Sequence, residues 1–340
     1  MDRLRIVVLT GGTSAEREIC LLSGRKVMSA LDPSRYDAVS VDLASIAEAR
    51  AADLAGILFR PPAEREHAPE QTVARDGRPD VVFIALHGGA GENGTVQGML
   101  ELLGIPYTGS GVLASALAMN KIMSKKIFER DGIPTPKWVP LAAAERASAP
   151  EAALTAVGLP CVVKPACEGS TIGVTIVRER EHLEAALDAA FRYGPEALAE
   201  QFIPGTEISA PVLGNDDARV LPLVEIVPPD GFYDYHAKYT PGATEEIVPA
   251  RIPQAAAERA RRLALAAHCT LGCRGFSRVD MIVGRDEVYV LEVNSIPGLT
   301  DTSLVPRAAE AEGISFSQLV GQIIGFALEE HGGRSGKPKA

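Results

Sequence analysis

The chain lacks the features that would direct it to a membrane or to nucleic acid. No apolar run among its 340 residues is long enough to cross a bilayer. The N-terminal MDRLRIVVLTGG leads from a basic start directly into a strand-like segment and a glycine turn, which is not the pattern of a signal peptide. Lysine and arginine number 34 against 44 acidic residues, and the formal charge of −10 disfavours a surface for nucleic acid or anionic lipid. We therefore expect a soluble, cytoplasmic protein that acts on small molecules.

Cysteine is also scarce, with five residues in an odd and scattered set. Cys269 and Cys273 lie closest together, and two thiols do not supply the four ligands of a structural zinc site. Reduced thiols in a cytoplasmic protein are the expected state. Apolar residues make up 46% of the chain, so its length suits two or three packed units with cores of their own.

The apolar pattern of the first hundred residues alternates between strand and helix. Residues 4–10 and 80–86 form runs typical of strands covered on both faces, and residues 94–104 form a helix stopped by Gly104. This order predicts a parallel α/β unit. Further along, the sequence predicts a helix over 109 to about 131, a helix over 256–271, a helix that begins at Ser315 with Gln318 in a capping box, and strands at 161–165, 174–177, 198–203, 208–213 and 219–227.

Two Val-rich runs near the C-terminal end carry the most informative side chains. Asp280 lies in RVDMIV, and Glu292 and Asn294 lie in VYVLEVNS. Because side chains alternate along a strand, Glu292 and Asn294 share a face, and Arg278 and Asp280 share a face by the same rule. Hard oxygen donors in a sheet suit Mg²⁺ or Mn²⁺ bound together with phosphates. On spacing alone, a salt bridge between Asp280 and Arg278 is an equal alternative.

Glycine-rich loops follow three of the predicted strands. Residues 11–18 and 87–94 each come after a buried strand, where α/β proteins bind ligands. Tight turns are the plain alternative, but two such loops at one sheet edge favour a ligand site. The third loop, EGSTIG (168–173), lacks the P-loop pattern and by itself is more typical of a simple hairpin turn. Lys164, in the apolar strand before it, favours phosphate binding by this loop.

Three other segments bear on function. GSGVLA (109–114) matches a dinucleotide fingerprint only loosely, because no acidic residue ends a second strand at the required distance. FYDYHAKY (232–239) is an aromatic loop of the kind that forms lids, or else an apolar clamp without chemistry. NSIPGLTDTSLVP (294–306) places the N–H of Gly298 and several hydroxyls behind the acidic strand, where they suit an oxyanion or carboxylate.

Taken in series, GGTSAERE, ALHGGAGENGTVQG, KPACEGSTIGV, FYDYHAKY, SRVD and EVNSIPG resemble the D-alanine–D-alanine ligases of the ATP-grasp superfamily, collinearly from about residue 5 to about 328. The resemblance implies an α/β and α+β architecture, the three-domain ATP-grasp fold with an N-terminal parallel α/β domain. Its expected boundaries are an N-terminal substrate-binding domain over 1–109, a central domain over 110–201, and a C-terminal domain with the metal site over 202–330. We expect a disordered tail over 331–340.

The resemblance also implies a reaction, in which ATP phosphorylates one D-alanine and the amine of a second D-alanine attacks the acyl phosphate. Two Mg²⁺ or Mn²⁺ ions are implied at Asp280, Glu292 and Asn294. The implied ATP-binding residues are Lys121, Lys164, Glu168, Ser170, Thr171, Glu200, Glu207 and Lys238. The implied catalytic set is Glu16, Ser170, Tyr239, Arg278 and Gly298, with His87 and Ser303 binding substrate. A homodimer follows from family likeness alone.

Four positions depart from the family's usual residues, namely Asn93, Gln201, His236 and Ser295. None is an implied metal or phosphate ligand, so they bear on affinity and second-substrate preference. Three other functions stay open. One is a ligase that joins D-alanine to D-lactate or D-serine, which the presence of Tyr239 disfavours. The others are a non-catalytic nucleotide-binding protein of this fold and an oxidoreductase that uses GSGVLA.

Overall fold

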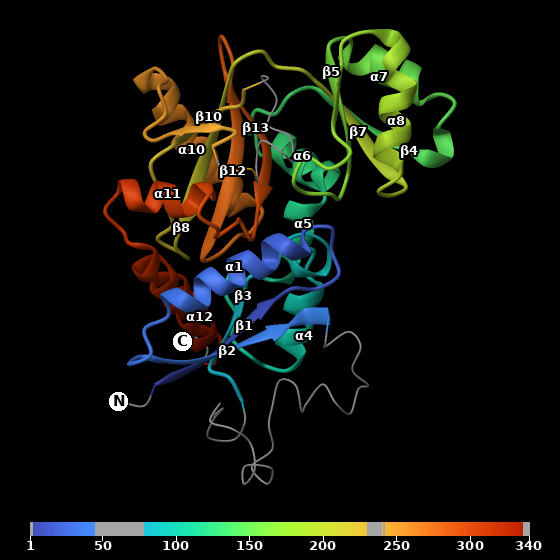
Figure 1. The fold of residues 1–340 in the computed structure, drawn as a ribbon. Helices are drawn as coiled ribbons and strands as arrows, with labels where there is room; N and C mark the ends of the chain where they lie inside the picture. The colour runs from blue at the N-terminus through green and yellow to red at the C-terminus, as the bar shows by residue number, and fades with distance from the viewer. Residues whose placement is uncertain (1–2, 45–77, 230–239, 241, 336–340) are drawn as a thin grey trace, which may run out of the picture.

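Three β-sheets organise the chain. The computed structural model describes residues 3–44, 78–229, 240 and 242–335. A three-stranded sheet lies near the N-terminus, a four-stranded sheet lies in the middle of the sequence, and a six-stranded sheet follows (Figure 1). Among the helices of the described residues, none has both the length and the apolar composition of a membrane span.

The N-terminal sheet has the order β2–β1–β3 and is parallel throughout. Its strands are β1 (Leu4–Thr10), β2 (Tyr36–Asp42) and β3 (Val81–Ile84), and β3 is fully buried as its unbroken apolar sequence predicts. Helix α1 (Arg17–Ala30) follows β1, and α4 (Thr95–Leu102) follows the loop behind β3. The two glycine loops therefore lie at the same sheet edge, as predicted from the parallel arrangement.

The central sheet is antiparallel, with the order β4–β7–β5–β6. Its strands are β4 (Trp138–Ala142), β5 (Cys161–Pro165), β6 (Thr175–Val177) and β7 (Glu196–Gln201). Helices α7 (Ala149–Val157) and α8 (Leu183–Phe191) bury alanine and leucine side chains against it. The predicted hairpin around residues 168–173 is the β5–β6 connection.

The C-terminal sheet has the order β11–β10–β8–β12–β13, with β9 paired to β8. Its long strands are β8 (Thr206–Leu213), β12 (Phe276–Val283) and β13 (Val288–Asn294), and its short ones are β9 (Arg219–Val220), β10 (Val224–Val227) and β11 (Glu245–Ile247). Helix α10 (Gln254–Thr270) packs its buried alanines and Leu263 on this sheet. Side chains of α5 (Val112–Met119) and α6 (Lys121–Arg130) join the same core.

The helix expected over 109 to about 131 is wrong as a single element. The chain forms α5 (Val112–Met119) and α6 (Lys121–Arg130), which are separated at Asn120. Asn120 has extended backbone angles, and its side-chain oxygen accepts a hydrogen bond from Met123 N at 3.0 Å. Such a cap begins a new helix, so the break places Lys121 at the first position of α6.

The strand expected over 219–227 is also interrupted, between β9 and β10. Pro222 lies in the gap and has no N–H with which to continue a ladder. The last helix, α12 (Phe316–Ser335), extends beyond residue 330, where we expected a disordered tail to begin. The expected capping box is present, since Ser315 N and Gln318 N each bond the other residue's side chain at 2.8 and 3.3 Å.

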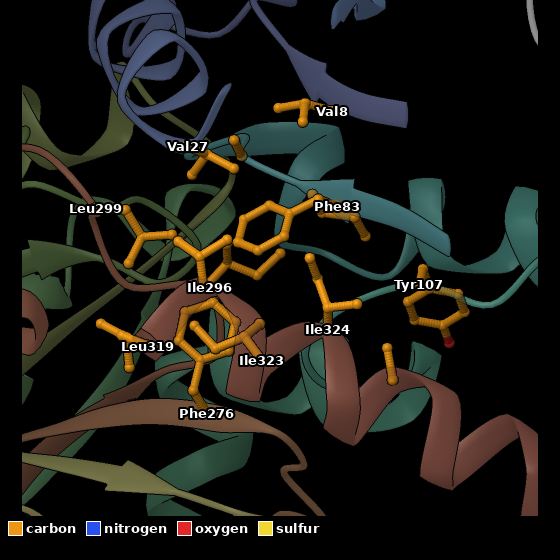
Figure 2. Close-up of a cluster of buried hydrophobic side chains, with 14 of the residues drawn as sticks. Val8, Val27, Phe83, Tyr107, Phe276, Ile296, Leu299, Leu319, Ile323 and Ile324 are labelled. Atoms are coloured by element: carbon orange, nitrogen blue, oxygen red, sulfur yellow. The ribbon is translucent and has the colours of Figure 1, made fainter. Parts of the chain in front are cut away.

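The largest apolar cluster joins the two ends of the chain. Val8, Val27 and Phe83 of the N-terminal unit meet Leu319, Ile323 and Ile324 of α12 (Figure 2). Phe276, Ile296 and Leu299, from the C-terminal sheet and the loop behind it, belong to the same cluster. Helix α11 (Leu304–Ala311) contributes Leu304 and Val305. The hydrophobic packing thus fixes the N-terminal sheet against the loop that follows β13.

Candidate active site

A cavity of about 420 Å³ lies between the central and C-terminal sheets. Its polar lining includes Lys121, Lys164, Glu168, Thr171, Glu200, Gln201, Glu207, Asp280 and Glu292. Apolar side chains, among them Phe202, Ile203, Ile282 and Leu291, line other parts of it. A cavity that combines apolar walls with lysines and carboxylates suits a molecule with an aromatic ring at one end and phosphates at the other.

Strands β12 and β13 bring the predicted acidic cluster together. Arg278 lies opposite Asn294, and Asp280 lies opposite Glu292, two positions further along the antiparallel ladder. Asp280 accepts two hydrogen bonds from the guanidinium of Arg278, at 2.9 and 2.8 Å, and one from Asn294 Nδ2 at 3.0 Å. The salt bridge that the spacing left open is therefore formed, within the same cluster as the predicted metal ligands.

Lys121 connects this cluster to the glycine loop. Its Nζ lies 3.1 Å from Glu292 Oε2 and donates to the Glu168 carbonyl oxygen at 2.5 Å. Burial lowers the pKa of Lys121, but the neighbouring carboxylate of Glu292 outweighs it, and the net pKa is raised. The ammonium is therefore charged where the glycine loop meets the acidic strand.

Glu200 is buried between two lysines. Its Oε1 bonds the Nζ of Lys164, and its Oε2 lies 2.8 Å from the Nζ of Lys125. Burial raises the pKa of Glu200, but the two ammonium groups outweigh burial and the net pKa is lowered. Lys125 was not predicted from the sequence. A lysine four residues after Lys121 on the same helix face is the signal that could have identified it.

The 168–173 loop reaches across to the N-terminal unit. Ser170 Oγ donates a hydrogen bond to Glu16 Oε1, which joins two segments 154 residues apart. Ser170 and Thr171 have φ values of 49° and 62°, a region that non-glycine residues adopt at an energetic cost. The loop is thus held by a tertiary contact in a conformation that local preferences disfavour.

A second, smaller cavity of about 60 Å³ lies beyond the acidic cluster. Its lining includes Glu16, His87, Glu92, Ser170, Arg278, Asn294, Gly298 and Ser303. Its size suits a small amino acid rather than a nucleotide. Arg278 and Asn294 face this cavity while Asp280 and Glu292 face the large one, so the β12–β13 pair separates and connects the two spaces.

His87 is held in the wall of the small cavity by contacts on both ring nitrogens. Nε2 lies 2.9 Å from Ser23 Oγ, and Nδ1 lies 3.2 Å from the Ile296 carbonyl oxygen and 3.8 Å from Glu92 Oε1. Burial lowers the pKa of His87, but Glu92 and Glu16 outweigh it and the net pKa is raised. Burial also raises the pKa of Glu92, a residue that the sequence did not single out.

Two glycines allow close approaches at this cavity. Gly88 has a φ of 70°, and a Cβ there would lie 2.7 Å from Glu16 Oε2. A Cβ at Gly298 would lie 2.7 Å from Ser303 Oγ. Ser303 Oγ accepts a hydrogen bond from Thr300 N at 2.9 Å, immediately before α11 begins. Glycine at Gly298 lets the Ser303 hydroxyl approach the backbone, and at Gly88 the positive φ favours glycine as well.

The remaining predicted residues divide into those described and those not described. Glu207 lines the large cavity beside Gln201, and Ser295 is buried after β13. Asn93 Oδ1 accepts from Thr95 N at 3.0 Å and so supports the start of α4. The structure does not describe the predicted lid segment with His236, Lys238 and Tyr239.

The GSGVLA segment (109–114) does not line either of the two cavities described above. Gly111 precedes α5, and the segment borders a separate cavity beside Tyr107, Arg274 and His331. The parallel sheet next to it has three strands, with one isolated bridge between Val82 and Tyr107. The fold around this segment therefore gives no support to the oxidoreductase alternative.

Comparison with known proteins agrees with this arrangement. The family profile described as D-ala D-ala ligase N-terminus matches residues 5–110, and the profile described as D-ala D-ala ligase C-terminus matches residues 127–325. The D-alanine–D-alanine ligase of Desulforudis audaxviator is 49% identical over 326 residues, covering 96% of this chain and 99% of that protein. The corresponding ligase of Moorella thermoacetica is 47% identical over 331 residues, with 96% and 100% covered.

Solved structures extend the similarity to the whole fold. The D-alanine–D-alanine ligase of Bacillus anthracis complexed with ATP matches with a TM-score of 0.78 at 33% identity, covering 98% of this chain and 100% of that chain. The VanG D-Ala:D-Ser ligase of Enterococcus faecalis matches with a TM-score of 0.78 at 32% identity, covering 96% and 100%. The expected α/β ATP-grasp fold is confirmed. The chain therefore belongs to the D-alanine–D-alanine ligase family.

Proposed function

We propose that this protein joins two molecules of D-alanine into D-alanyl-D-alanine for peptidoglycan precursor synthesis. ATP transfers its γ-phosphoryl group to the carboxylate of the first D-alanine, giving an acyl phosphate and ADP. The amine of the second D-alanine attacks that carbonyl, and phosphate leaves as the peptide bond forms. The observation that carries the proposal is the pair of cavities, one large and one small, that meet at the β12–β13 strands.

ATP fits the large cavity with its base near Glu200 and Glu207 and its phosphates near Lys121 and Lys164. Glu168, Ser170 and Thr171 provide the loop over the phosphates. We propose that Lys238 also binds the phosphates.

The donor set on β12 and β13 fits two Mg²⁺ or Mn²⁺ ions. Asp280 and Glu292 are direct neighbours across the ladder, and Arg278 and Lys121 supply the positive charge that balances them in the protein alone. Asp280, Glu292 and Asn294 are the residues that would hold the ions. The metal's contribution would be to neutralise the phosphate charge during transfer.

The first D-alanine occupies the small cavity, with its ammonium on Glu16. Ser170 orients Glu16 through the hydrogen bond between them. We propose that Tyr239 acts together with these two residues. His87 contacts the substrate from the cavity wall. Arg278 and the N–H of Gly298 stabilise the oxyanion that forms when the amine of the second D-alanine attacks. Ser303 binds the carboxylate of the second D-alanine. Catalysis is then mainly positioning and charge stabilisation.

Phosphate release from ATP tests the proposed substrates. With Mg²⁺ present, we expect release that depends on D-alanine and is absent with L-alanine, together with a dipeptide product seen by mass spectrometry. Release that requires D-lactate or D-serine beside D-alanine would instead identify the alternative ligases. Nucleotide binding without any phosphate release would favour the non-catalytic alternative.

Glu292→Gln tests the metal role separately. We expect turnover at low Mg²⁺ to fall about a hundredfold, because a neutral amide is a weak ligand for a hard dication, and to recover partly as Mg²⁺ is raised. Glu287→Gln, on the turn before β13, is the control, since Glu287 pairs with Arg259 instead. Unchanged activity of Glu292→Gln at low Mg²⁺ would contradict the role.

We also propose a location, domain boundaries, binding partners and an oligomeric state for the protein. Its location is the cytoplasm, and the domain boundaries are those expected at 109, 201 and 330. Binding partners are the small molecules ATP and D-alanine, without nucleic acid or membrane. Sedimentation velocity tests the homodimer, for which a single species of about 36 kDa would be the contrary result.

A further inference from the structure

Lys125 is a fully buried lysine to which the proposed function gives no role. It lies in the middle of α6 with none of its side chain exposed. Its Nζ donates to Thr135 Oγ1 at 2.5 Å and lies 2.8 Å from Glu200 Oε2. A buried ammonium is costly unless a carboxylate compensates it, so the position of Lys125 depends on Glu200.

Glu200 in turn has two counter-ions where one carboxylate needs only one. Lys164 reaches Oε1 from β5, and Lys125 reaches Oε2 from α6. Lys164 also lines the large cavity, whereas Lys125 does not. Burial lowers the pKa of Lys125, and the neighbouring ammonium of Lys164 contributes in the same direction. Both lysines are therefore counter-ions of the same carboxylate. Only Lys164 also faces the large cavity, where its ammonium can bind a phosphate instead.

We propose that Lys125 is a positioning residue for ATP, which keeps Glu200 compensated so that Lys164 can turn to the phosphates. When Lys164 moves toward the triphosphate, Lys125 and Glu200 remain as a neutral buried pair. Without Lys125, Lys164 would be the sole counter-ion of a buried carboxylate, and its release would leave that carboxylate uncompensated. This inference rests on the proposed function, in which Lys164 binds phosphate.

The contact with Thr135 supports the same role. Thr135 lies in the segment between α6 and β4, and the neighbouring Pro134 carbonyl oxygen accepts from Val290 N on β13 at 2.8 Å. Pro136 of this segment lines the large cavity. The Lys125 ammonium is thus fixed from the side of the segment and from the side of Glu200, independently of Lys164.

Calorimetric binding of a non-hydrolysable ATP analogue with Mg²⁺, and of adenosine alone, tests the proposal. For Lys125→Met we expect the affinity for the ATP analogue to fall about tenfold or more, and adenosine affinity to change less than about threefold, because only phosphates require the release of Lys164. Lys125→Arg keeps the charge and should retain the analogue's affinity within about threefold. Lys126→Met, at the exposed neighbouring position, is the matched control.

A double variant separates charge balance from packing. In Glu200→Gln the carboxylate is absent. Adding Lys125→Met to this variant should therefore lower the affinity for the ATP analogue by less than about threefold. An equal loss in both backgrounds, or an equal loss of adenosine and ATP analogue, would overturn the proposal, as would unaltered binding by Lys125→Met. If Lys125→Met alone does not fold, the comparison of Glu200→Gln with the double variant decides. Failure of the unaltered protein to bind the analogue would instead refute the proposed function.

Discussion

Lys121, Lys125 and Lys164 are buried, and each lies against a carboxylate. At the scale of single residues this compensation is what lets the site hold charge inside the protein. Asp280 follows the same rule, because Arg278 binds it through two nitrogens and Ser209 and Asn294 complete its hydrogen bonds. The several hydrogen bonds on Asp280 fix its carboxylate and the Arg278 guanidinium in place, which lowers the cost of ordering this part of the site on binding.

His268 behaves differently, because it is buried without a compensating charge. Its Nδ1 lies 2.7 Å from Ser277 Oγ, and its Nε2 has no hydrogen-bond partner within the described part of the chain. Burial lowers the pKa of His268 to about 4, from an ordinary value near 6.5. The neutral ring is therefore the form that the fold accepts.

Acid should consequently destabilise the protein through His268. The neutral His268 ring contributes fully to the free energy of unfolding above about pH 6.5. This contribution, up to about 3 kcal/mol, is lost as the pH falls toward 4. For His268→Asn we expect a smaller fall in the thermal midpoint between pH 7.5 and pH 5 than in the unaltered protein. His182→Asn, at an exposed position, is the control. Equal pH dependence in all three proteins would contradict the expectation.

At the scale of elements, short interruptions place the functional side chains. The break at Asn120 starts α6 at Lys121, whose ammonium reaches both the 168–173 loop and Glu292 on β13. A continuous helix over this segment would follow from the apolar periodicity alone. The cap at Asn120 overrides it because a side-chain oxygen satisfies the free N–H of the new helix.

The capping box of α12 can be tested in the same terms. Ser315→Ala should lower the free energy of unfolding by about 1 kcal/mol, since Gln318 N loses its acceptor at the helix start. Urea unfolding followed by circular dichroism measures the change. Gln318→Ala should act on the same unit, so the double variant should cost less than the sum. Gln322→Ala, at an exposed position of α12, should leave the midpoint almost unaltered.

At the scale of the whole molecule, α12 makes the two ends of the chain one packed unit. Ile323 and Ile324 are buried in the cluster that contains Phe83 of β3 and Phe276 of β12 (Figure 2). The loop with Gly298 and Ser303 lies between this cluster and the small cavity, because Ile296 and Leu299 are part of the core. Packing far from the chemistry therefore sets the position of the second-substrate residues.

Truncating this core should affect both ends of the chain together. We expect Ile324→Ala to lower the free energy of unfolding by about 2 to 5 kcal/mol, and Ile324→Val to lower it by about 0.5 to 1.5 kcal/mol. Hydrogen exchange should show β1, β3 and α12 losing protection in parallel. Loss confined to α12, with the N-terminal strands as protected as before, would show that the two ends are not coupled.

The sequence by itself determined the element types and the face on which each side chain lies. Apolar runs predicted β1 and β3, the Ser315–Gln318 pair predicted the start of α12, and the period of two placed Glu292 with Asn294 on one face and Arg278 with Asp280 on one face. These are local properties, because strand alternation and helix capping depend on residues within a few positions of one another.

Only the tertiary structure decided which distant side chains share a counter-ion or a cavity. The position of Lys125 against Glu200, the contact of Glu16 with Ser170, and the packing of α12 under the N-terminal sheet join residues 75, 154 and hundreds of positions apart along the chain. Apolar periodicity does not contain these contacts. They follow from the burial of whole faces against each other, which fixes the distances between charged groups only once the three sheets are packed.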